Sequence, residues 1–394
     1  MSMDALETRT QDAREAAQLR AAQEIFPDAG LTSLADLARL PVMRKDALCR
    51  GQAENLPFGA VPARNVSHIF QSPGPIYEPG STRPDFWRMG RFLAAMGFDA
   101  SDVAQNTFAY HFTPAGMMFE SAARAIGMVV FPAGPGQTMQ QAEVAAAIGT
   151  TAYIGTPDYL ATILAKGDEM GLDLSRITKA AVSAGPLFPQ MRAAYEARGI
   201  LCRQCYGTAD AGLIAYESAE STEGMIVDED VIVEIVTPGT GDPVATGEIG
   251  EVLVTVLNPD YPLLRFSTGD LSAILPGQSP CGRTNTRIVG WRGRADQATK
   301  VKGMFIRPEQ VATLVARHAD VAKARVEVHR GASGDEITVQ LETDATDPAA
   351  FQVSVSEILK LRAKIDLVAI GALPRDGVVV SDQRPALEQA VAGA

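Results

Sequence analysis

The chain has 394 residues, of which 46% are hydrophobic and 21% are charged, a composition that suits a globular protein of two or three domains rather than a disordered one. The formal net charge of −12 argues against nucleic acid or an anionic membrane as the main partner, although a few local Lys and Arg side chains can still hold a phosphate. The N-terminus shows no signal-peptide pattern, no apolar run reaches the roughly 18–20 residues of a spanning helix, and four cysteines fit a reducing compartment, so we expect a cytoplasmic protein with no membrane partner.

The first 60 residues predict a helical cap, because leucines recur at helical spacing between Leu31 and Leu40. From 66 to 207, short β-rich runs alternate with stretches of helical period. The expected strands are 66–71, 107–111, 128–132, 152–155, 179–183 and 200–206. The expected helices are 83–96, 114–126, 140–147, 157–170 and 189–198. This alternation predicts an α/β fold with βαβ units on a mostly parallel sheet.

The pattern changes after residue 224. Two β-branched runs, 231–236 and 251–256, flank a turn-rich segment and predict a β-rich subdomain over about 224–290. The rest of the chain predicts a compact α+β tail. Its expected helices lie near 308–318 and 348–364, and its expected strands lie near 323–330 and 336–343. We therefore expect a large N-terminal domain, 1–295, and a small C-terminal domain, 296–394.

Three motifs carry the candidate chemistry. In Tyr206-Gly207-Thr208-Ala209-Asp210, which follows an apolar run, Gly207 lets a flat ring or a phosphate approach the backbone at the carboxyl end of a strand. Asp270, which ends Arg265-Phe266-Ser267-Thr268-Gly269-Asp270, can accept two hydrogen bonds from a ribose diol. Basic residues crowd 287–303 and suit a phosphate anion. Taken singly, a plain turn, a solvated Asp and a solvated basic face explain the same three segments.

In this order and spacing, the three motifs together resemble the adenylate-forming superfamily, and within it the phenylacetate–CoA ligase group. The resemblance extends from about 66 to 384 and includes the segments 105–112, 131–138 and 238–251. It implies that a carboxylate attacks the α-phosphate of MgATP to give acyl-AMP and pyrophosphate. The C-terminal domain then rotates, and coenzyme A displaces AMP. The implied partners are a small, apolar, aromatic carboxylic acid, ATP, Mg²⁺ and coenzyme A, and the resemblance also favours a homodimer.

The resemblance implies roles position by position. Asp210 would hold the magnesium ion and act in catalysis, Arg294 would meet the phosphate or ribose, and Asp296 would be the hinge. The implied nucleotide and coenzyme A contacts are Ser72, Gly74, Ala184, Gly185, Pro186, Tyr206, Gly207, Thr208, Asp270, Arg287 and Gly303. The implied acyl pocket consists of Tyr110, His111, Phe112, Gly116, Ala133 and Gly134. A purely structural interpretation of His111, as a core residue on a strand, stays open.

The sequence departs from this family at the step that cleaves ATP. The family's phosphate loop is rich in Ser, Thr and Gly and ends in Lys-Pro, whereas this chain reads Gln71-Ser72-Pro73-Gly74-Pro75-Ile76-Tyr77-Glu78-Pro79. Near a triphosphate each close charge contact is worth about 1–3 kcal/mol, so a glutamate in place of the lysine weakens the attraction. Asp210 is one methylene shorter than the expected glutamate. The expected C-terminal catalytic lysine is missing, with Lys360 and Lys364, expected in a helix, as the nearest lysines.

Members of the group often carry a structural zinc ion. In this chain Ser218, Ile226 and Ser279 fall where ligands would be, and Cys281 alone cannot hold a tetrahedral zinc, so we expect no zinc site. The pair Cys202 and Cys205 lies on a predicted buried strand. Three functions stay open: an AMP-forming acyl- or aryl-CoA ligase, a relative that binds AMP, acyl-adenylate or acyl-CoA without cleaving ATP, and a pseudoenzyme or partner-binding subunit.

Overall fold

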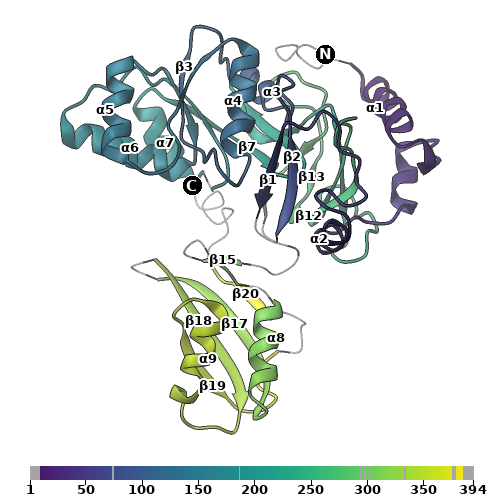
Figure 1. Cartoon of the computed structure of the whole chain (residues 1–394), viewed down its shortest axis with the longest axis vertical. Helices are drawn as coiled ribbons and strands as arrows, with labels where there is room; N and C mark the ends of the chain where they lie inside the picture. Colours follow the sequence, from purple (N-terminus) through teal and green to yellow (C-terminus); the bar gives the residue numbers. More distant parts are fainter. Residues whose placement is uncertain are drawn as a thin grey trace. The chain divides into compact units, whose positions relative to one another are not determined.

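A computed structural model describes residues 9–72, 75–185, 187–292, 295, 299–301, 304–306, 308–331, 334–374 and 379–384 (Figure 1). The predicted residues Gly74, Pro186, Arg294, Asp296 and Gly303 lie outside this set. The chain divides into two compact units, Met1–Arg292 and Gly293–Ala394. Among the helices of the described residues, none is long and apolar enough to cross a membrane.

The first unit is built on a nine-stranded sheet in the order β13-β14-β9-β8-β7-β6-β5-β3-β4. Its strands are β3 (Val103–Asn106), β4 (Val129–Pro132), β5 (Ala152–Gly155), β6 (Lys179–Val182), β7 (Leu201–Thr208), β8 (Gly212–Ser218), β9 (Ser221–Val227), β13 (Ile274–Leu275) and β14 (Arg287–Ile288). The strands from β4 to β7 pair in parallel, and those from β7 to β13 pair antiparallel. The α/β class is confirmed, but the sheet is parallel only in one half.

Helices cover both faces of the parallel half (Figure 1). They are α3 (Gly90–Ala95), α4 (Ala115–Ile126), α5 (Thr138–Ile148), α6 (Pro157–Met170) and α7 (Pro189–Ala197). Ala180 and Val182 of β6 pack with α5, α6 and α7, whereas Ala181 packs with α3 and α4. Neighbouring strand residues point to opposite faces, which explains why these strands read as continuous apolar runs.

Two predicted elements differ from the structure. The helix expected over 83–96 is only α3, because Asp85 and Arg88 have φ angles of 50° and 66°, left-handed values that interrupt a helix. The strand expected at 107–111 is instead β3, which ends at Asn106. The aromatic residues after it suit a strand by composition, but the chain turns there, and Phe112 has a φ of 61°.

The β-rich part of the first unit contains a three-stranded antiparallel sheet, β10 (Val231–Val236), β11 (Gly250–Val256) and β12 (Leu263–Ser272), and a hairpin, β1 (His68–Ser72) and β2 (Ile76–Gly80). The N-terminal segment forms α1 (Gln11–Ile25), the 3₁₀ helices η1 (Pro27–Ala29) and η2 (Leu34–Arg39), and α2 (Lys45–Glu54). The expected leucine face is a short 3₁₀ turn, and Leu31 and Leu37 pack against Ile232 of β10.

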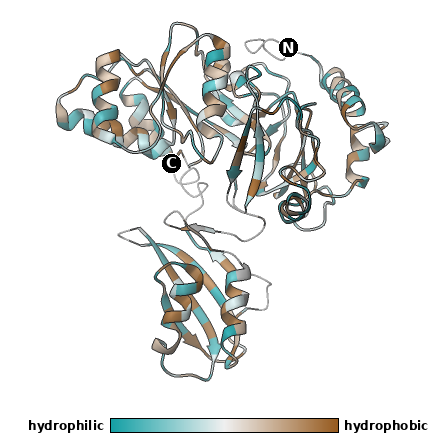
Figure 2. Cartoon of the chain, in the orientation of Figure 1, coloured by the Kyte–Doolittle hydropathy of each residue, from teal (hydrophilic) through white to brown (hydrophobic). Residues whose placement is uncertain are grey.

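The second unit has a four-stranded sheet in the order β19-β18-β17-β20. Its elements are β15 (Thr299–Val301), β16 (Met304–Ile306), α8 (Pro308–Arg317), β17 (Val321–Gly331), β18 (Gly334–Thr343), α9 (Ala349–Leu359), β19 (Lys364–Val368) and β20 (Val380–Asp382). Along β17 the buried Val326 and Val328 alternate with more exposed residues. Hydrophobic and hydrophilic residues are interspersed along the strands of this sheet (Figure 2). The helix expected to reach 364 ends at Leu359, because Lys360 has a φ of 58°, and Lys364 begins β19 instead.

Candidate active site

The carboxyl ends of β6 and β7 lie side by side and bring two predicted adenine-binding segments together. The Ser183 hydroxyl donates to the Cys205 carbonyl at 3.0 Å, and the exposed Ala184, with a φ of 60°, turns the chain beside Gly185. Thr208 accepts a hydrogen bond from the Ala211 amide at 3.0 Å, which closes the turn after β7. These segments therefore form one edge, as expected for a ligand site on an open α/β sheet.

The structure explains the glycine at position 207 in a different way from the sequence. A Cβ at Gly207 would lie 2.7 Å from the Gly212 carbonyl oxygen on β8. The close approach of the two strands therefore excludes a side chain, whether or not a ligand is bound.

A buried carboxylate lies beside this edge. Asp270 is 8% exposed, and its Oδ2 accepts a hydrogen bond from the Tyr206 hydroxyl at 2.8 Å. Its Oδ1 accepts one from the Trp291 indole at 3.1 Å. A donor on each oxygen helps to fix the plane of the carboxylate, and a carboxylate is an acceptor that suits a ribose hydroxyl. The aromatic Trp291 was not among the predicted site residues.

Asp210, the predicted magnesium ligand, is buried and ion-paired. Its Oδ2 lies 3.2 Å from the Lys45 ammonium, which is also 5.7 Å from the centroid of the Phe266 ring. Lys45 comes from α2, in the segment that the sequence indicates only as a helical cap. It was missed because its partner is far away in the chain. The Lys45 side chain is 35% exposed, whereas that of Asp210 is 3% exposed.

Glu78, the residue in place of the loop lysine, lies on β2 and points inward. It is 1% exposed. Burial, and then repulsion by the Asp210 carboxylate, raise the pKa of Glu78 to about 8, against opposing effects of Ser72 and Lys45. Ser72, a predicted phosphate contact, is thus also a neighbour of this carboxyl group. At pH 7 Glu78 is therefore mainly neutral. Its position in the loop suggests that it repels a phosphate, and the neutral form reduces that repulsion.

The predicted acyl pocket is organised by Asn106, the last residue of β3. The Asn106 amide donates to the Tyr110 hydroxyl and to the Gly116 carbonyl, both at 2.8 Å, and the Asn106 carbonyl accepts from the Gly134 amide at 3.0 Å. A Cβ at Gly116 would lie 2.6 Å from the Ala109 carbonyl oxygen, so only glycine fits there. Three separate predicted segments are therefore joined by one buried residue, through its side chain and its backbone carbonyl, that had no predicted role.

The other predicted pocket residues are more open. His111 and Phe112 are exposed, Phe112 at 72%, so the core interpretation of His111 is wrong. Ala133 is half-buried. The Phe112 carbonyl accepts a hydrogen bond from the Gln71 amide at 2.7 Å, which ties this loop to the end of β1.

Arg287 is buried among backbone carbonyls. Its guanidinium donates to the carbonyls of Glu223 and Pro276 at 3.0 Å and of Gly277 at 3.2 Å. These contacts join β14 to β9 and to the turn after β13, so the geometry favours a structural role over the predicted nucleotide contact.

The surroundings of three cysteines bear on the predictions about metal and redox chemistry. Cys202 and Cys205 pack on opposite faces of the sheet, and burial raises the pKa of each to about 12. Cys281 accepts from Arg283 at 3.5 Å and lies 3.0 Å from the Ser279 hydroxyl. Within the described part of the chain, no three His, Cys, Asp or Glu side chains are grouped for a metal ion.

Comparisons with known proteins agree with this geometry. Residues 88–256 match the family model of AMP-binding enzymes. The chain is 31% identical over 338 residues to a phenylacetate–coenzyme A ligase of Aromatoleum evansii, a match that covers 82% of this chain and 75% of that protein. It is 30% identical over 336 residues to the enzyme of the same name from Escherichia coli, covering 81% and 75%.

A solved structure resembles the chain over almost its whole length. A 2-hydroxyisobutyryl-CoA ligase, in complex with 2-HIB-AMP and CoA, superposes with a TM-score of 0.76 and covers 98% of this chain and 93% of its own. The sequences are 22% identical, so this likeness concerns the fold.

Proposed function

Because the chain belongs to the family of phenylacetate–coenzyme A ligases, we propose that it joins a small aromatic carboxylic acid to coenzyme A. The chain is an AMP-forming acid–CoA ligase that uses ATP and coenzyme A, with Mg²⁺ as the expected cation. The aromatic substrate, the homodimer and the cytoplasmic location are proposals.

The observation that carries the proposal is the Tyr206–Asp270–Trp291 cluster. A buried carboxylate oriented by two aromatic donors, beside the carboxyl end of β7, suits the 2′ and 3′ hydroxyls of a ribose. The adenine ring would lie between 184–185 and Tyr206. A nucleotide bound there places its phosphates beside the turn at 208–211 and beside Lys45, the cation that meets Asp210.

The reaction has two steps. A carboxylate oxygen of the acid attacks the α-phosphorus of ATP, and pyrophosphate leaves. The thiolate of coenzyme A then attacks the acyl carbon, and AMP leaves. The residues of this chain bind and orient the groups. Asp270 fixes the ribose, Lys45 offsets phosphate charge, and Asp210, whose oxygen atoms suit a hard cation, would hold Mg²⁺. The roles predicted for Arg294, Asp296 and Gly303 rest on the family resemblance.

The acyl pocket supports a small aromatic acid. Tyr110 is held by Asn106, and Phe108 in the same segment stacks on Phe119 with ring centroids 5.1 Å apart. Burial raises the pKa of the Tyr110 phenol, so it stays neutral and offers a ring and a hydroxyl to the substrate. Flat rings pack well against such surfaces.

The test is AMP and thioester formation with ATP, Mg²⁺, coenzyme A and a panel of aromatic and aliphatic acids. Aromatic acids should give the higher kcat/KM. Asp270→Ala should lower kcat/KM for ATP about 100-fold, and Tyr206→Phe by less, since it keeps the ring and loses only the hydroxyl. Glu143→Ala, an exposed change on α5, is the control. The proposal is wrong if no acid yields AMP or thioester.

A second candidate is a relative that binds AMP or acyl-CoA without cleaving ATP, and the loop at 71–79 favours it because prolines replace amide donors there. Calorimetry separates the two. Binding of AMP without binding of MgATP would support the second candidate.

A further inference from the structure

Three buried side chains next to the candidate phosphate site carry polar atoms without a hydrogen-bond partner. Among the described residues, both carboxylate oxygens of Glu78, Oδ1 of Asp210 and the hydroxyl of Tyr261 have none of normal geometry. The three residues are 1%, 7% and 3% exposed. They come from β2, from the turn after β7 and from the turn before β12, so distant parts of the chain converge on one place.

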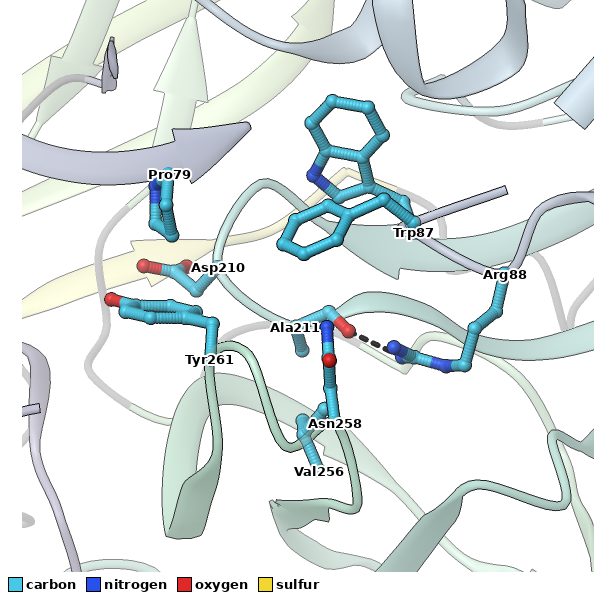
Figure 3. Close-up of a pocket in the computed structure, with 9 residues that line it drawn as sticks. Pro79, Trp87, Arg88, Asp210, Ala211, Val256, Asn258 and Tyr261 are labelled. Carbon is cyan, nitrogen blue, oxygen red and sulfur yellow. Dashed lines mark hydrogen bonds between the residues drawn. The ribbon is translucent and has the colours of Figure 1, made fainter. Parts of the chain in front are cut away.

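The three groups share one environment. Burial raises the pKa of the Tyr261 phenol, and the Asp210 and Glu78 carboxylates raise it further. Figure 3 shows the Tyr261 hydroxyl and the Asp210 carboxylate ending on the same side, near Pro79. A cavity of about 10 Å³ is lined by Pro79, Asp210 and Tyr261, with room for a ligand the size of one water molecule.

Leaving such atoms unpaired is unfavourable. Each buried polar group without a partner costs about 1–3 kcal/mol, and more if it is charged, so a native protein with several together usually holds a water or an ion among them. Two carboxylates beside one ammonium, that of Lys45, leave an excess of negative charge when both acids are ionised. A water can hydrogen-bond to these oxygens. Without a ligand, the proton on Glu78 offsets the excess charge, and a cation that binds here takes the place of that proton.

The ligand chemistry follows from the donor set. All four atoms are oxygens, and carboxylate and hydroxyl oxygens are the ligands of hard divalent cations such as Mg²⁺ and Mn²⁺. Lys45 pairs with Oδ2 of Asp210, and Oδ1 has no hydrogen-bond partner among the described residues. The exposed flank of Lys45 gives solvent, and so an ion, a route to the cluster.

We infer that Glu78, Asp210 and Tyr261 form a divalent-cation site that the protein fills before any nucleotide arrives. The glutamate in place of the loop lysine is then a second carboxylate ligand beside Asp210 rather than a lost contact. The positive charge near the phosphates comes from a cation that the protein itself holds. This catalytic meaning rests on the proposed function, whereas the binding of the cation does not.

The experiment is a titration of the metal-stripped full chain with Mn²⁺ in the absence of nucleotide, followed by the loss of the free Mn²⁺ signal in electron paramagnetic resonance. The unaltered chain should bind one ion. Glu78→Gln and Asp210→Asn should each weaken binding at least tenfold, and Tyr261→Phe a few-fold. The control is Asp46→Asn on α2, whose side chain is 66% exposed, which should bind as the unaltered chain does.

Each outcome decides the matter. No Mn²⁺ binding by the unaltered chain, or equal binding by Glu78→Gln, overturns the inference, and the first result would leave a proton or a water as the occupant. If Glu78→Gln fails to fold, as judged by circular dichroism, Asp210→Asn and Tyr261→Phe carry the test. Binding of Mn²⁺ without formation of AMP by the unaltered chain leaves the site intact and refutes the ligase proposal. Formation of AMP by a chain that binds no Mn²⁺ in the absence of nucleotide supports the ligase proposal and refutes the cation site.

Discussion

Arg265 is the largest fully buried side chain among the described residues, at 1% exposure. Its guanidinium binds both carboxylate oxygens of Glu234 at 3.0 Å and donates to the Gly241 carbonyl at 2.7 Å. Although Arg265 and Asp270 belong to one sequence motif, only Asp270 takes part in the candidate site. Arg265 instead fixes the loop after β10 to β12.

Replacing Arg265 with Ala should lower the free energy of unfolding by about 3–5 kcal/mol, because Glu234, with a side chain 15% exposed, is left without its partner. Urea unfolding measures the change. Arg39→Ala, which removes an ion pair whose arginine side chain is 79% exposed, should cost less than about 1 kcal/mol. Equal losses in the two variants would show that the burial of Arg265 contributes nothing.

The residues that the sequence missed have one property in common. Lys45 and Tyr261 owe their interest to groups on distant segments, such as Asp210 for Lys45, and Asn106 owes it to contacts that include the later segment at Gly134. No local pattern records such contacts. Asp270 and Tyr206 could be named because each lies in a short motif with a recognisable spacing. The motif did not reveal that their side chains hydrogen-bond to each other.

Among the elements, α3 begins beside a carboxyl group with an unusual acidity. The Gly90 amide donates to Asp85 at 2.9 Å. Burial raises the pKa of Asp85 from its ordinary 3.8 to about 7, and the Asp228 carboxylate adds to this, against the Gly90 amide and two arginines. The folded protein therefore holds this proton more tightly than the unfolded chain does.

The stability of the protein should depend on this group. The contribution of Asp85 is fully present below about pH 3.8 and is lost as the pH rises through 7, because the unfolded chain ionises first. Asp85→Asn keeps an oxygen that can accept the hydrogen bond from the Gly90 amide, but its side chain no longer titrates. Between about pH 5 and pH 8, the urea midpoint should fall less in this variant than in the unaltered chain. The exposed control Glu143→Gln should give urea midpoints that run parallel to those of the unaltered chain over this pH range. The same parallel course for Asp85→Asn would contradict the raised pKa of Asp85.

The sequence predicts elements well where one pattern dominates. The helix Pro157–Met170 and the strands Ala152–Gly155 and Val231–Val236 have the expected bounds. Its errors fall where backbone conformation decides. The left-handed φ angle of Asp85 interrupts the predicted helix before α3 begins, and that of Lys360 ends α9. Side-chain type gives little warning of such turns for residues other than glycine.

For the whole molecule, the two units have separate cores. Val326, Leu341 and Val355 belong to the core of the second unit, and those of the first unit form other clusters. Tyr206, Asp270 and Trp291 all precede residue 293. The antiparallel half of the sheet was not predicted. In it β7, β8 and β9 follow one another directly, whereas β14 pairs with β9 across a long stretch of chain.

A fragment of residues 1–292 should therefore fold and bind AMP, yet form no thioester, if the second unit serves the coenzyme A step as the family resemblance implies. Circular dichroism, calorimetry with AMP and chromatography of the acyl-CoA product measure the three properties. A folded fragment that fails to bind AMP would place part of the nucleotide site in the second unit.

The indole of Trp291 makes the site visible to a fluorimeter. The chain has two tryptophans: Trp87 is 4% exposed, and Trp291 is 48% exposed and donates to Asp270. A ribose that competes for this carboxylate changes the surroundings of the exposed Trp291, whereas the buried Trp87 lines the small cavity beside Asp210 and reports on that cavity. Intrinsic emission, resolved into a buried and an exposed component, is thus a label-free probe of nucleotide occupancy that the protein already contains.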